Sequence, residues 1–152
     1  VMVLGMSMGG ATAAAMALRD GLRSTPRLSH AILLDPWLDQ VGVSPLASSD
    51  LERDVSSSLR TCLIWLNEAS LVYAASKGPA DVLVGKATRA NARTAELITV
   101  KDAGHYAQTD IPSVFEHGPL RCIYLALKGK GQNVDMAPPA REALKSCIAR
   151  IL

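Results

Sequence analysis

The stretch VMVLGMSMGGATAAAMAL, residues 1–18, predicts a strand, a tight turn and a helix in direct succession. Residues 1–4 form a continuous apolar run of the kind found in strands of buried parallel sheets. After the glycines, small and apolar residues recur at helical spacing, namely Ala11, Ala14, Ala15, Leu18 and Leu22. The turn between them, residues 5–10, decides how the chain is interpreted.

Residues 5–9, GMSMG, fit the pattern G-x-S-x-G, in which a serine stands on a sharp strand-to-helix turn with its Oγ above the sheet. Glycines on both sides of Ser7 allow the turn and let the helix pack closely on the strand. The backbone N–H of Met8 is then the expected oxyanion donor. The pattern arises by chance in about one chain in twenty of this length. Its place between an apolar run and a helix therefore carries the argument, and a structural glycine turn is the alternative.

The rest of the chain alternates short apolar runs with helical patterns. Further strands are predicted at residues 31–34, 61–66 and 97–100, a loop with one helical turn at 36–58, and helices at 81–96, 114–127 and 138–152. Such alternation is typical of the α/β class, with about four parallel strands flanked by helices and both faces of the sheet covered. We expect a single domain over residues 1–152.

Composition excludes several classes of function. The chain of 152 residues is 49% hydrophobic and 20% charged, which suits a soluble globular protein, and no apolar run approaches the roughly 18 residues of a membrane span. The net charge is +2 with scattered basic residues, which argues against nucleic acid as a partner. Cys62, Cys122 and Cys147 are widely spaced, so we interpret them as reduced core residues. No cysteine or histidine spacing suits a metal, and we expect neither metal nor cofactor.

A nucleophilic serine needs a base and an acid, which on this architecture follow in the order serine, acid, histidine. His105 lies in a short loop with Gly104 just beyond a predicted strand, at the carboxyl edge where sites gather in parallel sheets. We therefore predict that His105 is the base. His30 precedes a strand and His117 falls in a polar part of a predicted helix, so both are interpreted as ordinary histidines.

Asp35 ends the second predicted strand, again at the carboxyl edge, and is the favoured acid. Asp39, four residues further on, and Glu68, just beyond the third strand, remain alternatives. The alternative is that Asp35 has only a structural role and forms a strand-end turn with Pro36.

The segments GMSMGGATAA, AILLDPWLD, CLIWLNEAS and ELITVKDAGHYAQTDI occur in the order seen in platelet-activating factor acetylhydrolases. The whole chain resembles the C-terminal half of that family, which has an α/β-hydrolase fold. The resemblance favours Asp35 over Glu68, and implies Ser7 as nucleophile, His105 as base, Met8 as one oxyanion donor and Glu68 as a structural residue. It implies hydrolysis, without calcium, of a short acyl chain from the sn-2 position of a phospholipid through an acyl-serine intermediate.

The family's N-terminal half, with further strands and the second oxyanion donor, has no counterpart in this sequence, so we expect a fragment of a larger protein. Two other functions stay open. One is another serine esterase or lipase of the same fold, acting on a small soluble ester. The other is a truncated, non-catalytic remnant. A phospholipid substrate is compatible with contact at a membrane or lipoprotein surface, and the sequence does not define a compartment.

Overall fold

The computed structural model describes residues 1–38 and 46–105, together with Glu142, Lys145, Ser146 and Ala149. Two compact units make up the chain. The first comprises Val1–Leu66 and Val72–Ile98, and the second comprises Asn67–Leu71 and Thr99–Leu152. That residues 1–152 form a single domain stays a prediction.

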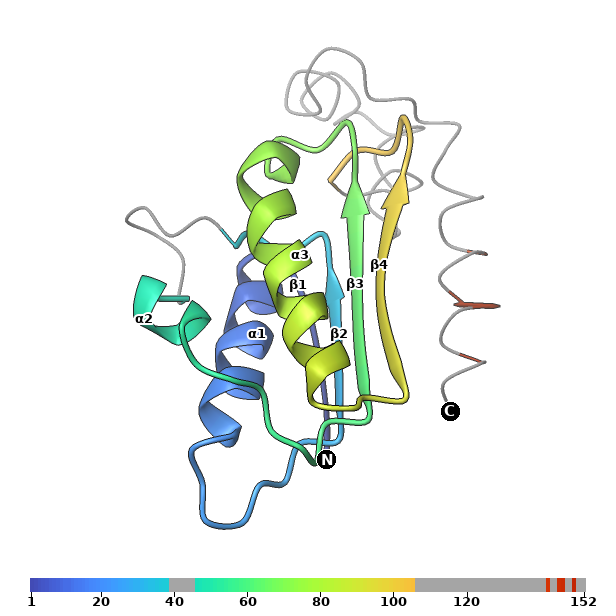
Figure 1. The fold of residues 1–152 in the computed structure, drawn as a ribbon. Coiled ribbons are helices and arrows are strands. Elements are labelled where there is room, and N and C mark those ends of the chain that lie inside the picture. The colour runs from blue at the N-terminus through green and yellow to red at the C-terminus, as the bar shows by residue number, and fades with distance from the viewer. Residues whose placement is uncertain (39–45, 106–141, 143–144, 147–148, 150–152) are drawn as a thin grey trace. The chain divides into compact units, whose positions relative to one another are not determined.

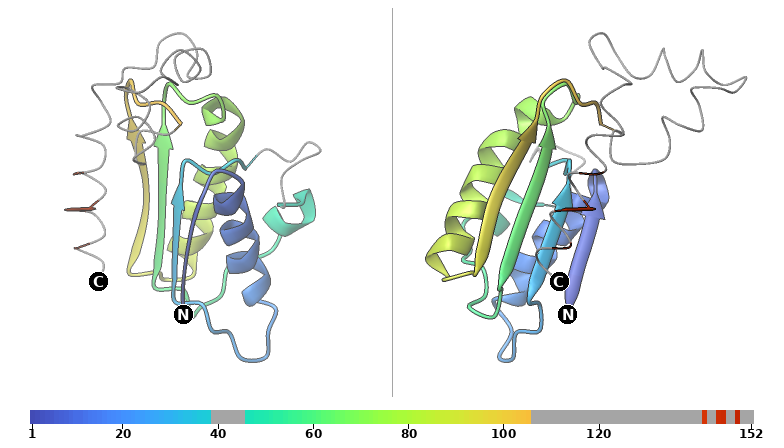
Figure 2. Two further views of the ribbon diagram at one scale, coloured as in Figure 1. Left: turned by 180° about the vertical axis from the view of Figure 1, so that it is seen from behind. Right: turned by 90° about the vertical axis from the view of Figure 1, so that its right-hand side faces the viewer.

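The described elements form a parallel α/β sheet with its strands in chain order, β1-β2-β3-β4 (Figure 1). The elements are β1 (Met2–Met6), α1 (Met8–Asp20), β2 (His30–Leu34), α2 (Ser48–Leu51), β3 (Thr61–Asn67), α3 (Tyr73–Arg89) and β4 (Thr94–Val100). Right-handed crossovers that always move in one direction leave their helices on the same face. Accordingly, α1 and α3 cover one face of the sheet (Figure 2). The predicted fold class is confirmed.

The core lies between this face and the two helices. Alanines on α1 let its backbone approach the sheet, so Ala11, Ala14 and Leu18 pack in one cluster with Leu33 and Ile64. Burial of β2 and β3 extends to both faces, as central parallel strands require, because Ile32, Leu63 and Trp65 on the opposite side are also fully buried. At β1, by contrast, Met2 and Leu4 are about half exposed.

The prediction for residues 81–100 was wrong in its boundaries. The helix α3 spans Tyr73–Arg89 rather than 81–96, and β4 begins at Thr94 rather than at residue 97. Gly78 and Pro79 look like a helix breaker, yet Pro79 lies inside α3. Burial of Ala80, Leu83 and Ala87 on one face of the helix offsets the lost backbone hydrogen bond.

The strands predicted at residues 1–4, 31–34 and 61–66 match β1, β2 and β3, and the single helical turn predicted in the loop is α2. Residues 39–45 of that loop lie outside the described residues, as does the whole helix predicted at 114–127. The helix predicted at 138–152 is helical at its four described positions.

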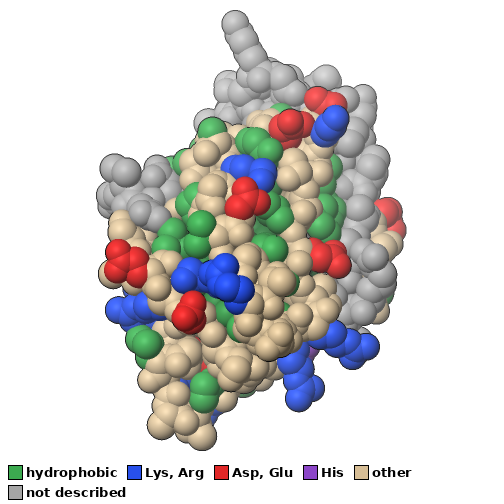
Figure 3. Space-filling view, viewed as in Figure 1, with side chains coloured by type: hydrophobic (Ala, Val, Ile, Leu, Met, Phe, Trp, Pro, Cys, Tyr) green, Lys and Arg blue, Asp and Glu red, His purple; other side chains and the backbone are tan. Residues whose placement is uncertain are grey.

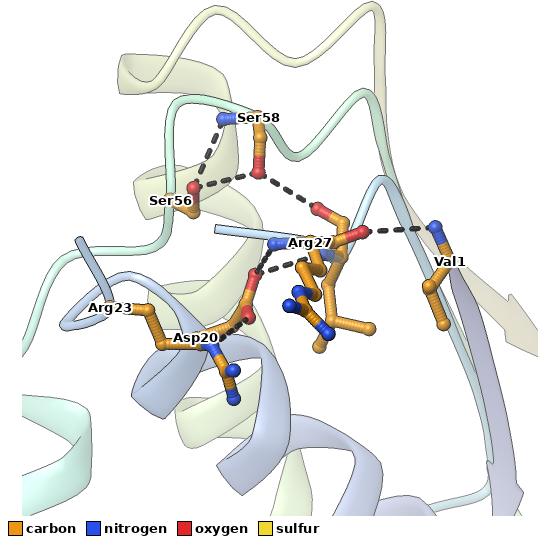
Figure 4. A network of polar contacts seen from close by, with 7 residues as sticks. Val1, Asp20, Arg23, Arg27, Ser56 and Ser58 are labelled. Atoms are coloured by element: carbon orange, nitrogen blue, oxygen red, sulfur yellow. Dashed lines mark hydrogen bonds and ion pairs between the residues drawn. The ribbon is translucent and has the colours of Figure 1, made fainter. Parts of the chain in front are cut away.

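At the amino end of the sheet, a polar network joins the chain just before β1 and β2 to the end of α1 (Figure 4). The buried carboxylate of Asp20 accepts hydrogen bonds from the amides of Arg27 and Leu28, each at 2.8 Å. The Val1 amino group donates to the carbonyl of Arg27 at 2.9 Å. A cavity of about 320 Å³ lies at this end, lined in part by Asp20 and Leu28. It is therefore separate from Ser7, at the other end of β1.

On the face seen in Figure 3, basic and acidic side chains are interspersed rather than segregated. Among the described elements, no helix has both the length and the apolar character needed to cross a bilayer.

Candidate active site

Ser7 alone makes the turn between β1 and α1. Its backbone has φ 54° and ψ −123°, a conformation that non-glycine residues rarely adopt and that costs on the order of 1–3 kcal/mol. The amide of Ser7 donates to the carbonyl of Leu34 at 3.1 Å, and its own carbonyl accepts from the amide of Trp37 at 2.9 Å. Leu34 is the last residue of β2 and Trp37 lies in the turn after it, so this end of β2 holds the strained Ser7 turn in place.

The Ser7 side chain is not used as a helix cap. Serine at this position usually bonds a backbone amide of the first turn, but Ser7 makes no such side-chain bond to α1. Met8 is the first residue of α1, so its N–H has no acceptor within the helix. Both groups therefore meet the local requirements of a nucleophile and an oxyanion donor.

Close packing at the turn depends on Gly5, the first glycine of the motif, and on Gly10, which lies just beyond it, rather than on Gly9. A Cβ on Gly5 would overlap the carbonyl group of Gly9, and a Cβ on Gly10 would lie 2.7 Å from the Cβ of Pro36. A Cβ on Gly9 meets no atom of the described chain within 4 Å. The helix start thus packs on both the strand before it and the turn after β2.

Asp35 follows β2 directly and is itself strained, with φ 41°. Its side chain is fully buried, and its amide donates to the carbonyl of Trp65 on β3 at 2.6 Å. Because Leu34 and Trp37 bond to Ser7, the first unit brings the Ser7 and Asp35 turns together at the carboxyl edge. Two strained residues in neighbouring turns are a feature that clusters at functional sites.

The alternative acids differ in their surroundings. Glu68 has an exposed side chain, and its amide donates to the carbonyl of Val100 at 2.9 Å. Asp39 lies outside the described residues. Burial therefore separates Asp35 from Glu68.

His105 belongs to the second unit, so its meeting with Ser7 and Asp35 stays a prediction. Its side chain is buried, with its Nδ1 3.3 Å from the hydroxyl of Ser70. The amide group of Asn67 donates to the carbonyl of Gly104 at 2.7 Å. Sequence reasoning gave no role to Asn67 or Ser70; the available signal was their polar character at the end of a buried strand and in the residues that follow it.

The other predicted residues need only brief description. His30 starts β2 at the amino end of the sheet and contacts the Ser29 hydroxyl through Nδ1 at 2.8 Å. Cys62 is a free thiol in the core, and burial raises its pKa to about 12. His117, Cys122 and Cys147 lie outside the described residues.

Together these features define an α/β protein with a strained serine turn at the carboxyl edge of a parallel sheet. The family model "Platelet-activating factor acetylhydrolase, isoform II" matches residues 1–145, and the chain belongs to this family. The resemblance inferred from sequence is thereby confirmed, and membership implies a hydrolase of phospholipid esters. Searches among curated proteins and among solved structures gave no match.

Proposed function

We propose that the chain carries the catalytic residues of a serine-dependent carboxylic ester hydrolase. Its substrate would be a phospholipid such as platelet-activating factor, from which the enzyme removes the sn-2 acetyl or short acyl group without calcium. A substrate of this kind brings the protein to a membrane or lipoprotein surface. The proposal combines family membership with the geometry of Ser7.

The strained backbone of Ser7 is the observation that carries the proposal. If this turn had only a structural role, Ser7 could adopt a common backbone conformation, or a glycine could occupy the position without strain. Instead, Ser7 is held at φ 54° by Leu34 and Trp37, and its hydroxyl leaves the helix uncapped. Strain of this kind persists where the surrounding structure over-determines it, as in nucleophile turns.

In the proposed reaction, Ser7 Oγ attacks the carbonyl carbon of the sn-2 ester while His105 Nε2 removes its proton. The Met8 N–H stabilises the oxyanion of the tetrahedral intermediate. Collapse of the intermediate expels the lysophospholipid hydroxyl, which takes the proton from His105, and leaves an acyl-serine. Water, activated by His105, then releases the carboxylic acid and restores Ser7.

Asp35 has the role of stabilising the positive charge of the His105 imidazolium that forms in the reaction. Its full burial supports this assignment because a buried carboxylate needs a partner that compensates its charge. Asp35 also lies in the turn that is bonded to Ser7.

A serine-directed fluorophosphonate probe tests the nucleophile. The protein at its full natural length should be labelled, Ser7→Ala should not be labelled, and Ser58→Ala should be labelled normally. Ser58 is a suitable control because its hydroxyl bonds the carbonyl of Leu28 at the amino end of the sheet. Equal labelling of Ser7→Ala would overturn the assignment, and no labelling of the folded wild type would support a non-catalytic remnant.

Substrate class needs a separate comparison. Turnover of 2-acetyl phosphatidylcholine should exceed that of a soluble aryl acetate when both are measured with a calcium chelator present. A preference for the aryl ester would instead indicate another serine esterase of the same fold.

A further inference from the structure

Residues 67–70, which begin at the last residue of β3, bind the segment that carries His105 at four successive points. Backbone amides supply two of these contacts, from Glu68 to the carbonyl of Val100 at 2.9 Å and from Ala69 to the carbonyl of Ala103 at 3.1 Å. The other two come from side chains, those of Asn67 and Ser70. All four contacts lie within the second unit.

Asn67 fixes the backbone of the His105 loop. Its side chain is fully buried, and its Nδ2 donates to the carbonyl of Gly104 at 2.7 Å. That carbonyl belongs to the peptide group that joins Gly104 to His105. Because Gly104 allows this peptide group many orientations, a buried hydrogen-bond donor is needed to select one of them. By selecting it, Asn67 fixes the direction in which the His105 side chain extends from the backbone.

Ser70 contacts the imidazole itself. Its hydroxyl lies 3.3 Å from His105 Nδ1, and both side chains are buried. A hydroxyl can donate or accept, and acceptance favours the tautomer with the proton on Nδ1. That tautomer leaves the Nε2 lone pair available, which is the form a general base needs. The contact is long, as hydrogen bonds of catalytic groups often are before substrate binds.

The 67–70 segment is itself held in shape. The amide of Ser70 donates to the carbonyl of Asn67 at 3.0 Å, which closes the turn and fixes the spacing of the two side chains. This turn therefore places both the Asn67 bond to the Gly104 carbonyl and the Ser70 contact with the His105 ring.

We propose that Asn67 and Ser70 are the positioning residues of His105, with Asn67 setting the loop backbone and Ser70 the ring tautomer. This inference rests on the proposed function in giving His105 the part of base. Neither residue touches the reacting ester, and each acts through His105. Ser70 and His105 also form a serine–histidine pair, so a nucleophilic Ser70 is the competing explanation and an outcome of the test.

The tautomer is measured by nitrogen NMR of protein labelled with 15N-histidine, with His105→Gln used to assign the signal. In the wild type, the His105 signals should show protonation at Nδ1. Ser70→Ala should increase the Nε2-protonated population and lower kcat about threefold to tenfold, the effect of one lost hydrogen bond, with KM changed less than twofold. Ser70→Thr, which keeps the hydroxyl, should restore both.

Asn67→Asp tests the hydrogen bond from Asn67 to the Gly104 carbonyl. Aspartate keeps the shape of the asparagine side chain but places an acceptor where the Nδ2 donor lies. It should shift the His105 signals and lower kcat at least as much as Ser70→Ala, while Ser58→Ala changes neither. If Asn67→Asp fails to fold, the Ser70 pair decides the proposal alone.

Unchanged His105 signals in folded Ser70→Ala would overturn the positioning role. Loss of fluorophosphonate labelling in Ser70→Ala, with labelling retained in Ser7→Ala, would make Ser70 the nucleophile and overturn it as well. The NMR result does not depend on turnover, so it separates failure of this inference from failure of the proposed function.

Discussion

The amide of Trp37 donates a hydrogen bond of 2.9 Å to the carbonyl oxygen of Ser7. This bond joins the turn after β1 to the turn after β2, and the bond from the Ser7 amide to Leu34 completes the link. Neither turn can change its backbone without disturbing the other. The two strained residues, Ser7 and Asp35, are therefore positioned as a pair by main-chain contacts, whatever their side chains do.

The packing of α1 predicts opposite effects for two adjacent glycines. Gly10→Ala should destabilise the protein by about 1–3 kcal/mol, because its Cβ would press against Pro36. Gly9→Ala is the matched control and should stabilise by about 0.5–1 kcal/mol, because alanine suits a helix better than glycine. Urea unfolding curves measure both. Equal effects would show that the contact with Pro36 does not limit the packing of α1.

The assignment of the acid predicts different outcomes for two carboxylates. Asp35→Asn should lower kcat by about 10⁴, the effect seen when the carboxylate of such a triad is neutralised, without loss of fold. Glu68→Gln should stay within about twofold, since this side chain is exposed. Ester hydrolysis by both purified variants measures the difference. The reverse order would transfer the acid role to Glu68.

An ion pair between α1 and α2 predicts a loss of stability in acid. Arg19 binds Asp50 through two bonds, at 3.0 and 2.6 Å, and this contact holds the pKa of Asp50 below its ordinary value of 3.8. A lowered pKa stabilises the fold above the unfolded value, and that stability is lost as the pH falls below about 4 toward the folded pKa.

Urea midpoints at several pH values test this ion pair. Asp50→Asn should unfold at lower urea than the wild type at pH 7, and the difference should shrink below pH 4. Asp54→Asn is the control, because the Asp54 side chain is 89% exposed and surface pairs contribute little. A difference between wild type and Asp50→Asn that is independent of pH would contradict the assignment.

Burial of Cys62 predicts an unreactive thiol. In the Cys122→Ser, Cys147→Ser double variant, a disulfide reagent at pH 8 should modify Cys62 only after unfolding. The raised pKa of about 12 also means that the thiol stabilises the fold below its unfolded pKa, near 9, and that this contribution falls as the pH rises toward 12. The alkaline loss of stability should therefore be smaller in Cys62→Ala. Rapid modification of the native protein would show that Cys62 is accessible.

Most of the sheet could be predicted because its strands contain continuous apolar runs that are followed by glycine or polar residues. The helix α3 could not be placed correctly, since Gly78 and Pro79 favour a turn locally and only burial of Ala80, Leu83 and Ala87 favours the helix. Tertiary packing overrides the local preference for a turn at this point, and tertiary packing is not visible in a single sequence.

The candidate site divides in the same way. Ser7 and Asp35 could be chosen from their places after strands, because parallel strands bring their carboxyl ends to one edge. Asn67 and Ser70 could not, because their importance depends on which loop β4 brings beside them, and no spacing in the sequence records that. Whether His105 joins the first pair is the part that stays a prediction.

The contact between Gly10 and Pro36 has an evolutionary consequence. Descendants of this protein that lost ester cleavage would still have to keep Gly5 and Gly10, because selection for folding alone retains them. The glycines therefore record the ancestry of the architecture, and under the proposed function the side chains at positions 7, 35 and 105 are those that would distinguish working enzymes from silent relatives in a genome survey.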